Sequence, residues 1–284
     1  MGKITMVFFG EDLFSDIVLN SLLDKNYNIP LVVSPLYDNT IYKRLQETCK
    51  KNNIEYIREQ NINSNTVVEK VIEISPDILI TAHFEKLIKK ELLSIPKLGC
   101  LNLHPSILPK YRGMSPQHWP IINGDDKTGI TIHFIDEGID TGNIVLQREI
   151  LLNDQIYVYD LQMAWRQMYK SVMCEAVEKV ILGYRGEKQN SYEGSYYGKL
   201  KPEQCKINLS GSMFDAYNLI RGVSMPYHGA YIENEQGKTT IWKADIHCNN
   251  PITTIGVIEN SQGSYYLSFN DGTLLIKKHE IKNN

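Results

Sequence analysis

Two polar side chains that could take part in a reaction lie where an apolar run of the chain ends. Asn102 and His104 close the run 99–104, and Pro105 follows at once. Side chains two positions apart in a strand point to the same face, and proline cannot continue the strand as a hydrogen-bond donor. The sequence therefore predicts an amide with two N–H donors beside an imidazole that can move protons near neutral pH. Both would lie at the carboxyl end of a strand, where open α/β sheets bind ligands.

Asp140, which precedes Thr141 and Gly142, is the third candidate. Taken alone, each of the three could be an ordinary strand-end or turn residue. Together they belong to a string of motifs: Asn102-x-His104-Pro-Ser-x-Leu-Pro, Arg112-Gly113-x-x-Pro116, Gly124, Thr128-Gly-Ile-Thr131 and Asp140-Thr-Gly142. This string resembles the central segment of the folate-dependent formyltransferases, the family that includes methionyl-tRNA formyltransferase and the nucleotide-sugar N-formyltransferases.

The resemblance implies transfer of a formyl group from N10-formyltetrahydrofolate to an amine, with Asn102, His104 and Asp140 as the catalytic residues. His104 can take a proton from the attacking amine. Asn102 can donate to an oxygen that gains negative charge. Asp140 can accept from the imidazole and stabilise its charged form. This chemistry requires no metal and no covalent nucleophile.

The resemblance also implies where the folate binds. In relatives, the segment equivalent to 86–88 gives backbone contacts to the pterin, and the loop equivalent to 136–140 returns to the same cleft. Taken without the resemblance, these positions would be helix-core residues and solvated loop charges. The expected folate-binding residues are Lys86, Leu87, Ile88, Met114, Asp136, Glu137, Gly138, Ile139 and Asp140.

Three further residues are candidates for binding the acceptor substrate. Arg112 could bind a substrate phosphate, or it could brace its loop by hydrogen bonds to carbonyl groups. Tyr197 and Lys199 lie in a segment that resembles the aromatic and basic linker of the sugar-nucleotide enzymes. Their alternative interpretation is an ordinary surface strand between two domains.

The acceptor is predicted to be a nucleotide-linked amino-deoxysugar, most simply a dTDP-linked one, used in surface polysaccharide (lipopolysaccharide or O-antigen) biosynthesis. The connection at 34–40 lacks the longer basic insertion of the tRNA-directed enzymes. The tail 205–284 has seven Lys and Arg against seven Asp and Glu, which is a poor balance for a tRNA contact surface. The alternatives are methionyl-tRNA formyltransferase and a non-catalytic folate- or nucleotide-binding protein. Glycinamide ribonucleotide formyltransferase is disfavoured because that type lacks the tail.

Alternating apolar strands and amphipathic helices in the first half predict an α/β fold, a Rossmann-like, mostly parallel sheet with helices on both faces. Helices are expected at about 40–53, 65–75, 85–94 and 158–182. The tail reads as a small antiparallel β module, OB-like or a reduced barrel, with strands near 230–232, 239–244, 255–258, 265–269 and 273–277. The predicted domains are a catalytic domain at 1–183, a linker at 184–204 and a β-rich domain at 205–284.

The whole chain is ordinary for a globular protein of 284 residues, with a formal net charge of −3. No G-x-G-x-x-G follows the first strand, so the usual dinucleotide site is not expected. Five cysteines without a C-x-x-C predict neither a zinc site nor a disulfide framework. No run approaches the ~18 apolar residues of a membrane span. We therefore expect a cytoplasmic enzyme that binds folate and a small nucleotide sugar. We expect it to bind no metal, membrane or nucleic acid. An exposed face of the tail or of the long helix could support a homodimer.

Overall fold

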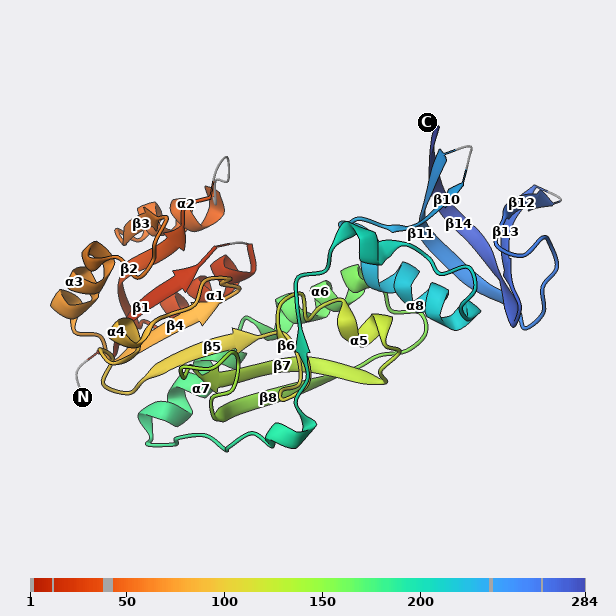
Figure 1. Cartoon of the computed structure of the whole chain (residues 1–284). Helices are drawn as coiled ribbons and strands as arrows, with labels where there is room; N and C mark the ends of the chain where they lie inside the picture. Colours follow the sequence, from red (N-terminus) through yellow and green to blue (C-terminus); the bar gives the residue numbers. More distant parts are fainter. Residues whose placement is uncertain (1–2, 12, 38–42, 235–236, 262, 284) are drawn as a thin grey trace. The chain divides into compact units, whose positions relative to one another are not determined.

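The computed structural model describes residues 3–11, 13–37, 43–234, 237–261 and 263–283 (Figure 1). The chain forms two compact units. The first comprises residues 1–113, 129–149 and 164–196, and the second comprises 114–128, 150–163 and 197–284. The first part of the predicted linker thus clusters with the first unit and its remainder with the second. The domain boundaries given above stay a prediction.

A seven-stranded sheet with the order β3-β2-β1-β4-β5-β7-β8 is the framework of the site. Its strands are β1 (Thr5–Gly10), β2 (Asn28–Pro35), β3 (Glu55–Glu59), β4 (Ile78–Ala82), β5 (Cys100–His104), β7 (Lys127–Phe134) and β8 (Ile144–Leu151). The pairs β1–β2, β1–β4, β2–β3 and β4–β5 are parallel, and β5–β7 is antiparallel. The predicted mostly parallel, Rossmann-like sheet is confirmed.

Helices pack on this sheet because its strands are apolar on both faces. They include α1 (Leu13–Asp24), α2 (Lys43–Lys51), α3 (Asn65–Ile74), α4 (Lys90–Leu93) and α7 (Val172–Ile181). Helix α5 (Trp119–Ile122) belongs to the second unit, and α6 (Val158–Met168) has residues 158–163 in the second unit and 164–168 in the first. Val7 and Phe9 of β1 share a core with Val67 of α3 and Leu92 of α4. The chain changes direction along the sheet between β1 and β4. In such sheets, ligands bind at the carboxyl ends of the strands beside this point.

The helix predicted at 85–94 is wrong for its first half, since only Lys90–Leu93 is helical. The backbone before it bonds to side chains that are distant in the sequence. Asn63 donates to the carbonyl of Leu87 and accepts from the N–H of Lys89, at 2.9 and 2.8 Å. The N–H of Glu85 donates to the carboxylate of Glu11. These partners replace the hydrogen bonds of a helical turn.

The single long helix predicted at 158–182 is two helices, α6 and α7, separated at residues 169–171. Tyr169 lies in the break and is fully buried. Its hydroxyl is 2.9 Å from Nε2 of His83, whose ring stacks on Phe14. A tyrosine anchored in this way fixes the chain where the helix stops. Among the described residues, no helix combines the length and the apolar character that crossing a membrane requires.

The second unit contains the antiparallel sheet predicted for the tail, in the order β10-β11-β14-β13-β12. Its strands are β10 (Ala230–Asn234), β11 (Gly237–Cys248), β12 (Ile258–Ser261), β13 (Ser264–Phe269) and β14 (Gly272–Asn283). The strand expected at 255–258 thus begins only at Ile258. Helix α8 (Met213–Val223), which the sequence analysis did not predict, begins at the N-cap Ser212. Met213 and Ile220 of α8 share a core with Leu274 of β14.

His118, in the second unit, is expected to make the stability of the fold depend on pH. It is buried, and its Nδ1 donates to the carbonyl of Gly222 at 2.7 Å. Burial lowers the pKa of His118 from 6.5 to about 4. The hydrogen bond to the carbonyl of Gly222 opposes this lowering, and His228 adds a smaller lowering. Between these values the unfolded chain binds a proton that the folded chain does not. The free energy of unfolding should therefore fall as the pH falls through this window, by about 3 kcal/mol at most.

Denaturant unfolding at pH 7 and pH 4.5 checks this expectation. We expect the loss of stability on acidification to be smaller in His118→Asn than in the unmodified protein, because asparagine cannot take up the proton. An equal loss in both proteins would show that His118 is not the responsible group.

Candidate active site

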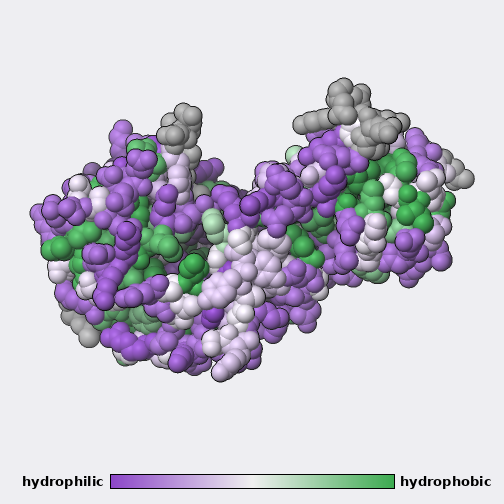
Figure 2. All heavy atoms as spheres, viewed as in Figure 1, coloured by the Kyte–Doolittle hydropathy of each residue, from purple (hydrophilic) through white to green (hydrophobic). Residues whose placement is uncertain are grey.

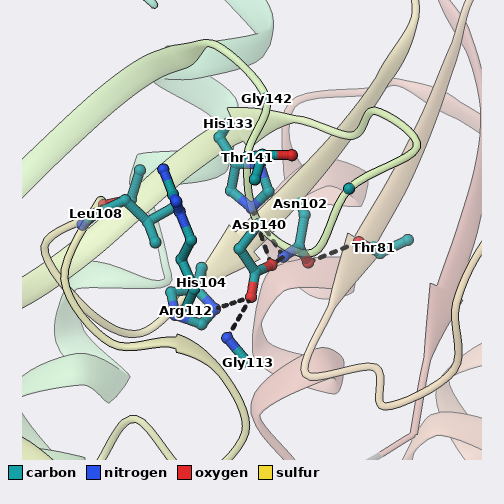
Figure 3. Close-up of polar contacts among 12 residues, drawn as sticks. Thr81, Asn102, His104, Leu108, Arg112, Gly113, His133, Asp140, Thr141 and Gly142 are labelled. Atoms are coloured by element: carbon teal, nitrogen blue, oxygen red, sulfur yellow. Dashed lines mark hydrogen bonds and ion pairs between the residues drawn. The ribbon is translucent and has the colours of Figure 1, made fainter. Parts of the chain in front are cut away.

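Strands β5 and β7 place the amide and the imidazole as the strand periodicity predicts. Asn102 pairs in register with His133, and His104 pairs with Thr131. Asn102 and His104 therefore lie on the same side of β5, next to the side chains of the neighbouring strand. Figure 3 shows Asp140, from the loop after β7, meeting Asn102 and His104 at this place. The structure thus brings the three predicted catalytic residues together.

The carboxylate of Asp140 is the centre of the cluster. Its Oδ2 accepts from the backbone N–H of Gly113 at 2.8 Å and lies 3.5 Å from Nδ1 of His104. Its Oδ1 lies 3.4 Å from both Nδ2 of Asn102 and Nε2 of His133. Burial raises the pKa of Asp140, but the two histidines and the N–H of Gly113 together hold it well below its ordinary value. Asp140 is therefore ionised at neutral pH.

The two ring nitrogens of His104 have different partners. Nε2 is 2.8 Å from the carbonyl of Tyr111. A carbonyl only accepts, so Nε2 carries a hydrogen. Nδ1 then faces Asp140 as the nitrogen that can take up a proton. Burial lowers the pKa of His104 below 6.5, and His133 lowers it further, whereas Asp140 and the Tyr111 carbonyl oppose this. The imidazole is therefore a neutral base near pH 7.

The amide of Asn102 is held at both ends. Its Oδ1 accepts from the hydroxyl of Thr81 at 2.7 Å, which fixes Nδ2 on the other side. Nδ2 is 3.1 Å from Nε2 of His133 and 3.4 Å from Asp140. Its weaker bond, to Asp140, is the one that an oxyanion could replace. The sequence analysis missed Thr81 and His133. Thr131-x-His133 on β7 carries the same alternating signal as Asn102-x-His104 on β5.

Arg112 is buried, and its guanidinium contacts groups of the protein. Oε1 of Gln189 accepts from Nε at 3.2 Å and from Nη2 at 2.6 Å. Nη1 donates to the hydroxyl of Tyr196 at 3.2 Å, and the guanidinium lies 5.3 Å from the centre of that ring. Of the two interpretations of Arg112, this geometry favours bracing, here through side chains rather than carbonyl groups.

Comparison with known proteins identifies the family of this chain. The formyl transferase family model matches residues 3–177, and the model of the formyl transferase C-terminal domain matches residues 199–284. The chain belongs to the formyl transferase family. The methionyl-tRNA formyltransferase of Clostridioides difficile is 31% identical over 98% of this chain and 92% of its own length. That of Thermodesulfovibrio yellowstonii is 31% identical over 95% of this chain and 89% of its own length.

Solved structures of formyltransferases share the fold. An N-formyltransferase from Helicobacter canadensis, in complex with folinic acid and dTDP-3-aminofucose, has a TM-score of 0.77 at 24% identity and covers 98% of this chain and 100% of its own. A methionyl-tRNA formyltransferase from Clostridium thermocellum has a TM-score of 0.61 at 20% identity and covers 99% and 100%. Members of this family use N10-formyltetrahydrofolate as the formyl donor.

Each of the two loops predicted to bind the folate exposes an apolar side chain. Leu87, in the loop after β4, is 67% exposed, and Ile139, in the loop after β7, is 48% exposed. An ion pair of 3.5 Å between Lys90 and Glu137 joins the two segments. Exposed apolar side chains beside polar backbone are what a pterin ring would cover. Ile88, in contrast, is buried in the core, so only its backbone could meet a ligand.

The other residues predicted to bind the folate or the acceptor lie in several different surroundings. Lys86 lies with its Nζ 4.8 Å from the centre of the Tyr37 ring. Asp136 accepts from the N–H of Gly138 and the hydroxyl of Thr141, which shapes the loop before Asp140. Met114, Tyr197 and Lys199 belong to the second unit. There the hydroxyl of Tyr197 accepts from Asn123 at 2.9 Å, and its ring lies 4.7 Å from that of Trp119.

Proposed function

We propose that this formyltransferase transfers a formyl group to a primary amine and that Asn102, His104 and Asp140 carry the reaction. The observation that supports this most strongly is the single carboxylate of Asp140, which lies within 3.5 Å of both His104 and Asn102. The arrangement joins a base, an ionised partner for that base and an amide donor. These are the three groups that acyl transfer to an amine needs.

Each residue then has a defined task. N10-formyltetrahydrofolate, when bound, would supply the formyl group and would leave as tetrahydrofolate, its N10 taking up a proton in place of the formyl group. Nδ1 of His104 accepts a proton from the attacking amine, and the resulting imidazolium lies beside the ionised Asp140. An N–H of Asn102 Nδ2 can donate a hydrogen bond to the oxygen that gains charge, in place of its 3.4 Å contact with Asp140. Thr81 holds the amide in the orientation that this requires.

For the acceptor, we place methionyl-tRNA first. The curated relatives reported above, which are 31% identical over 95–98% of this chain, are methionyl-tRNA formyltransferases. This support is stronger than the prediction of a nucleotide sugar from the sequence, and it runs against the expectation that the protein binds no nucleic acid.

A nucleotide-linked amino sugar is the second candidate, and charge favours it. The tail has no net positive charge, and two of its lysines pair with acids of the same unit, Lys206 with Glu233 and Lys277 with Asp245. Figure 2 shows apolar residues lying between hydrophilic ones on the visible face of the second unit. A tRNA-binding surface needs a basic patch. Residues 38–42, within and just after the short connection that also supported a sugar, lie outside the described residues.

Parallel assays with formyl-labelled N10-formyltetrahydrofolate test the proposal. The acceptors are methionyl initiator tRNA and a panel of dTDP-, UDP- and GDP-linked 3- and 4-amino sugars. We expect label on methionyl-tRNA, with binding that weakens as salt rises because phosphate contacts release counterions. Label on a sugar alone would reverse the order of the two candidates. Label on no amine, with the folate bound, would contradict the proposed function.

A further inference from the structure

Gln189 links three parts of the first unit that are distant in the sequence. It follows α7 in the segment predicted as a linker and is only 7% exposed. Its Nε2 donates to the carbonyls of Asp140 and Gly142, both at 2.8 Å. Its Oε1 accepts twice from Arg112. Both N–H groups and both acceptor lone pairs of this amide are thus directed at the two segments beside the site.

The loop around Asp140 needs such a partner. Asp140 has a φ of 53°, in the left-handed region that few residues other than glycine adopt. Two residues later, a Cβ on Gly142 would lie 1.8 Å from the carbonyl oxygen of Phe134, so the chain passes very close to β7 there. The carbonyls of this tight turn bond to the side-chain amide of Gln189, which satisfies them and holds the turn.

The carbonyl oxygen of the Gln189 side chain is linked to the carboxylate of Asp140 through Arg112 and Gly113. Arg112 precedes Gly113, whose N–H donates to Oδ2 of Asp140 at 2.8 Å. Gln189 therefore fixes both the backbone that carries Asp140 and the short strand β6 (Arg112–Gly113), which binds the side chain of Asp140. The contacts close a ring from Gln189 through Arg112, Gly113 and Asp140 back to Gln189.

We propose that Gln189 is a positioning residue, which acts through Asp140 by holding its carboxylate against His104. Catalytic geometry then depends on a residue of the segment after α7, outside the motifs of the central segment. This inference rests on the proposed role of Asp140 in formyl transfer. It does not depend on which amine accepts the formyl group.

Titration of His104 in the free protein tests the inference without an acceptor. The groups that face His104 are Asp140, His133 and the carbonyl of Tyr111. In Gln189→Met, which keeps the length of the side chain but not its hydrogen bonds, Asp140 should move away from His104. The pKa of His104, followed by NMR with ¹³C-labelled histidine and assigned with His104→Asn, should then fall by about half to one unit. Asn190→Ala, an exposed neighbour, should leave it unchanged. An unchanged pKa of His104 in folded Gln189→Met would overturn the inference.

Gln189→Glu separates positioning of Asp140 from bracing of Arg112, and it serves if Gln189→Met fails to fold. A carboxylate still accepts from Arg112, but it has no hydrogen for the carbonyls of Asp140 and Gly142. We expect kcat to fall about 10–100-fold, as for the loss of other supporting hydrogen bonds, with the KM for folate changed less than about threefold because the folate loops are untouched. Activity near that of the unmodified enzyme would show that Gln189 only braces Arg112, which would overturn the inference. Since the titration needs no acceptor, its outcome is separable from failure of the proposed function.

Discussion

Replacing His104 with asparagine is expected to lower kcat about 10²–10⁴-fold, the range that general bases contribute. Asparagine keeps a polar side chain beside Asp140, but it is too short to reach the carbonyl of Tyr111, which now accepts from Nε2 of His104 at 2.8 Å. It cannot take up a proton from the amine. The loss should therefore appear in kcat, whereas the KM for folate should change little. Steady-state kinetics with the acceptor identified by the labelling assay provide the measurement.

Two controls keep this result interpretable. His247→Asn, at an exposed position of β11, should leave kcat unchanged. The thermal unfolding midpoint of His104→Asn should show that the variant is folded. A folded His104→Asn enzyme with undiminished kcat would remove His104 from the mechanism.

The second large effect is expected from Asp140→Asn, which should lower kcat about 10²–10⁴-fold, as in other sites where a carboxylate supports a catalytic histidine. Asparagine is one of the few residues that tolerate a left-handed backbone such as the φ of 53° found here. The fold should therefore survive the change. What is lost is the charge 3.5 Å from Nδ1 of His104 that stabilises the imidazolium.

This variant also has a pH signature with a defined sign. Asp140 raises the pKa of His104 against the lowering effect of burial. Without that charge the pKa falls further, so the acidic limb of kcat/KM should move to lower pH. The pH profiles of the unmodified enzyme and of Asp140→Asn give the measurement, with the exposed Asp24→Asn as the matched control. A limb that stays in place would mean that Asp140 does not act on His104.

The parts of the fold that could be predicted are those determined by residues close to one another in the sequence. The buried strands were visible as short apolar runs, and alternation along β5 placed Asn102 and His104 on one side. The region at 85–89 could not be predicted in this way, because its backbone bonds to Asn63 and Glu11. A helical pattern in the sequence carries no information about such distant partners.

The same distinction explains which site residues were missed. His133 carries a local signal, since Thr131-x-His133 lies opposite Asn102 and His104 on the neighbouring strand, and an antiparallel register would have revealed it. Gln189 carries no local signal, because it follows α7 in a polar segment and reaches Asp140 only through the tertiary fold. The identity of the acceptor could not be predicted from the central motifs either. It depends on the charge and shape of surfaces, on which the central motifs have no bearing.

The most direct test of the account is to follow the labelled formyl carbon from N10-formyltetrahydrofolate in a single turnover, with the unmodified enzyme and His104→Asn side by side. The account predicts that the label appears on the amine of one acceptor with the unmodified enzyme, and that it appears at least about 10²-fold more slowly with the variant. Equal rates of labelling, or release of the label as formate without any formylated amine, would contradict it.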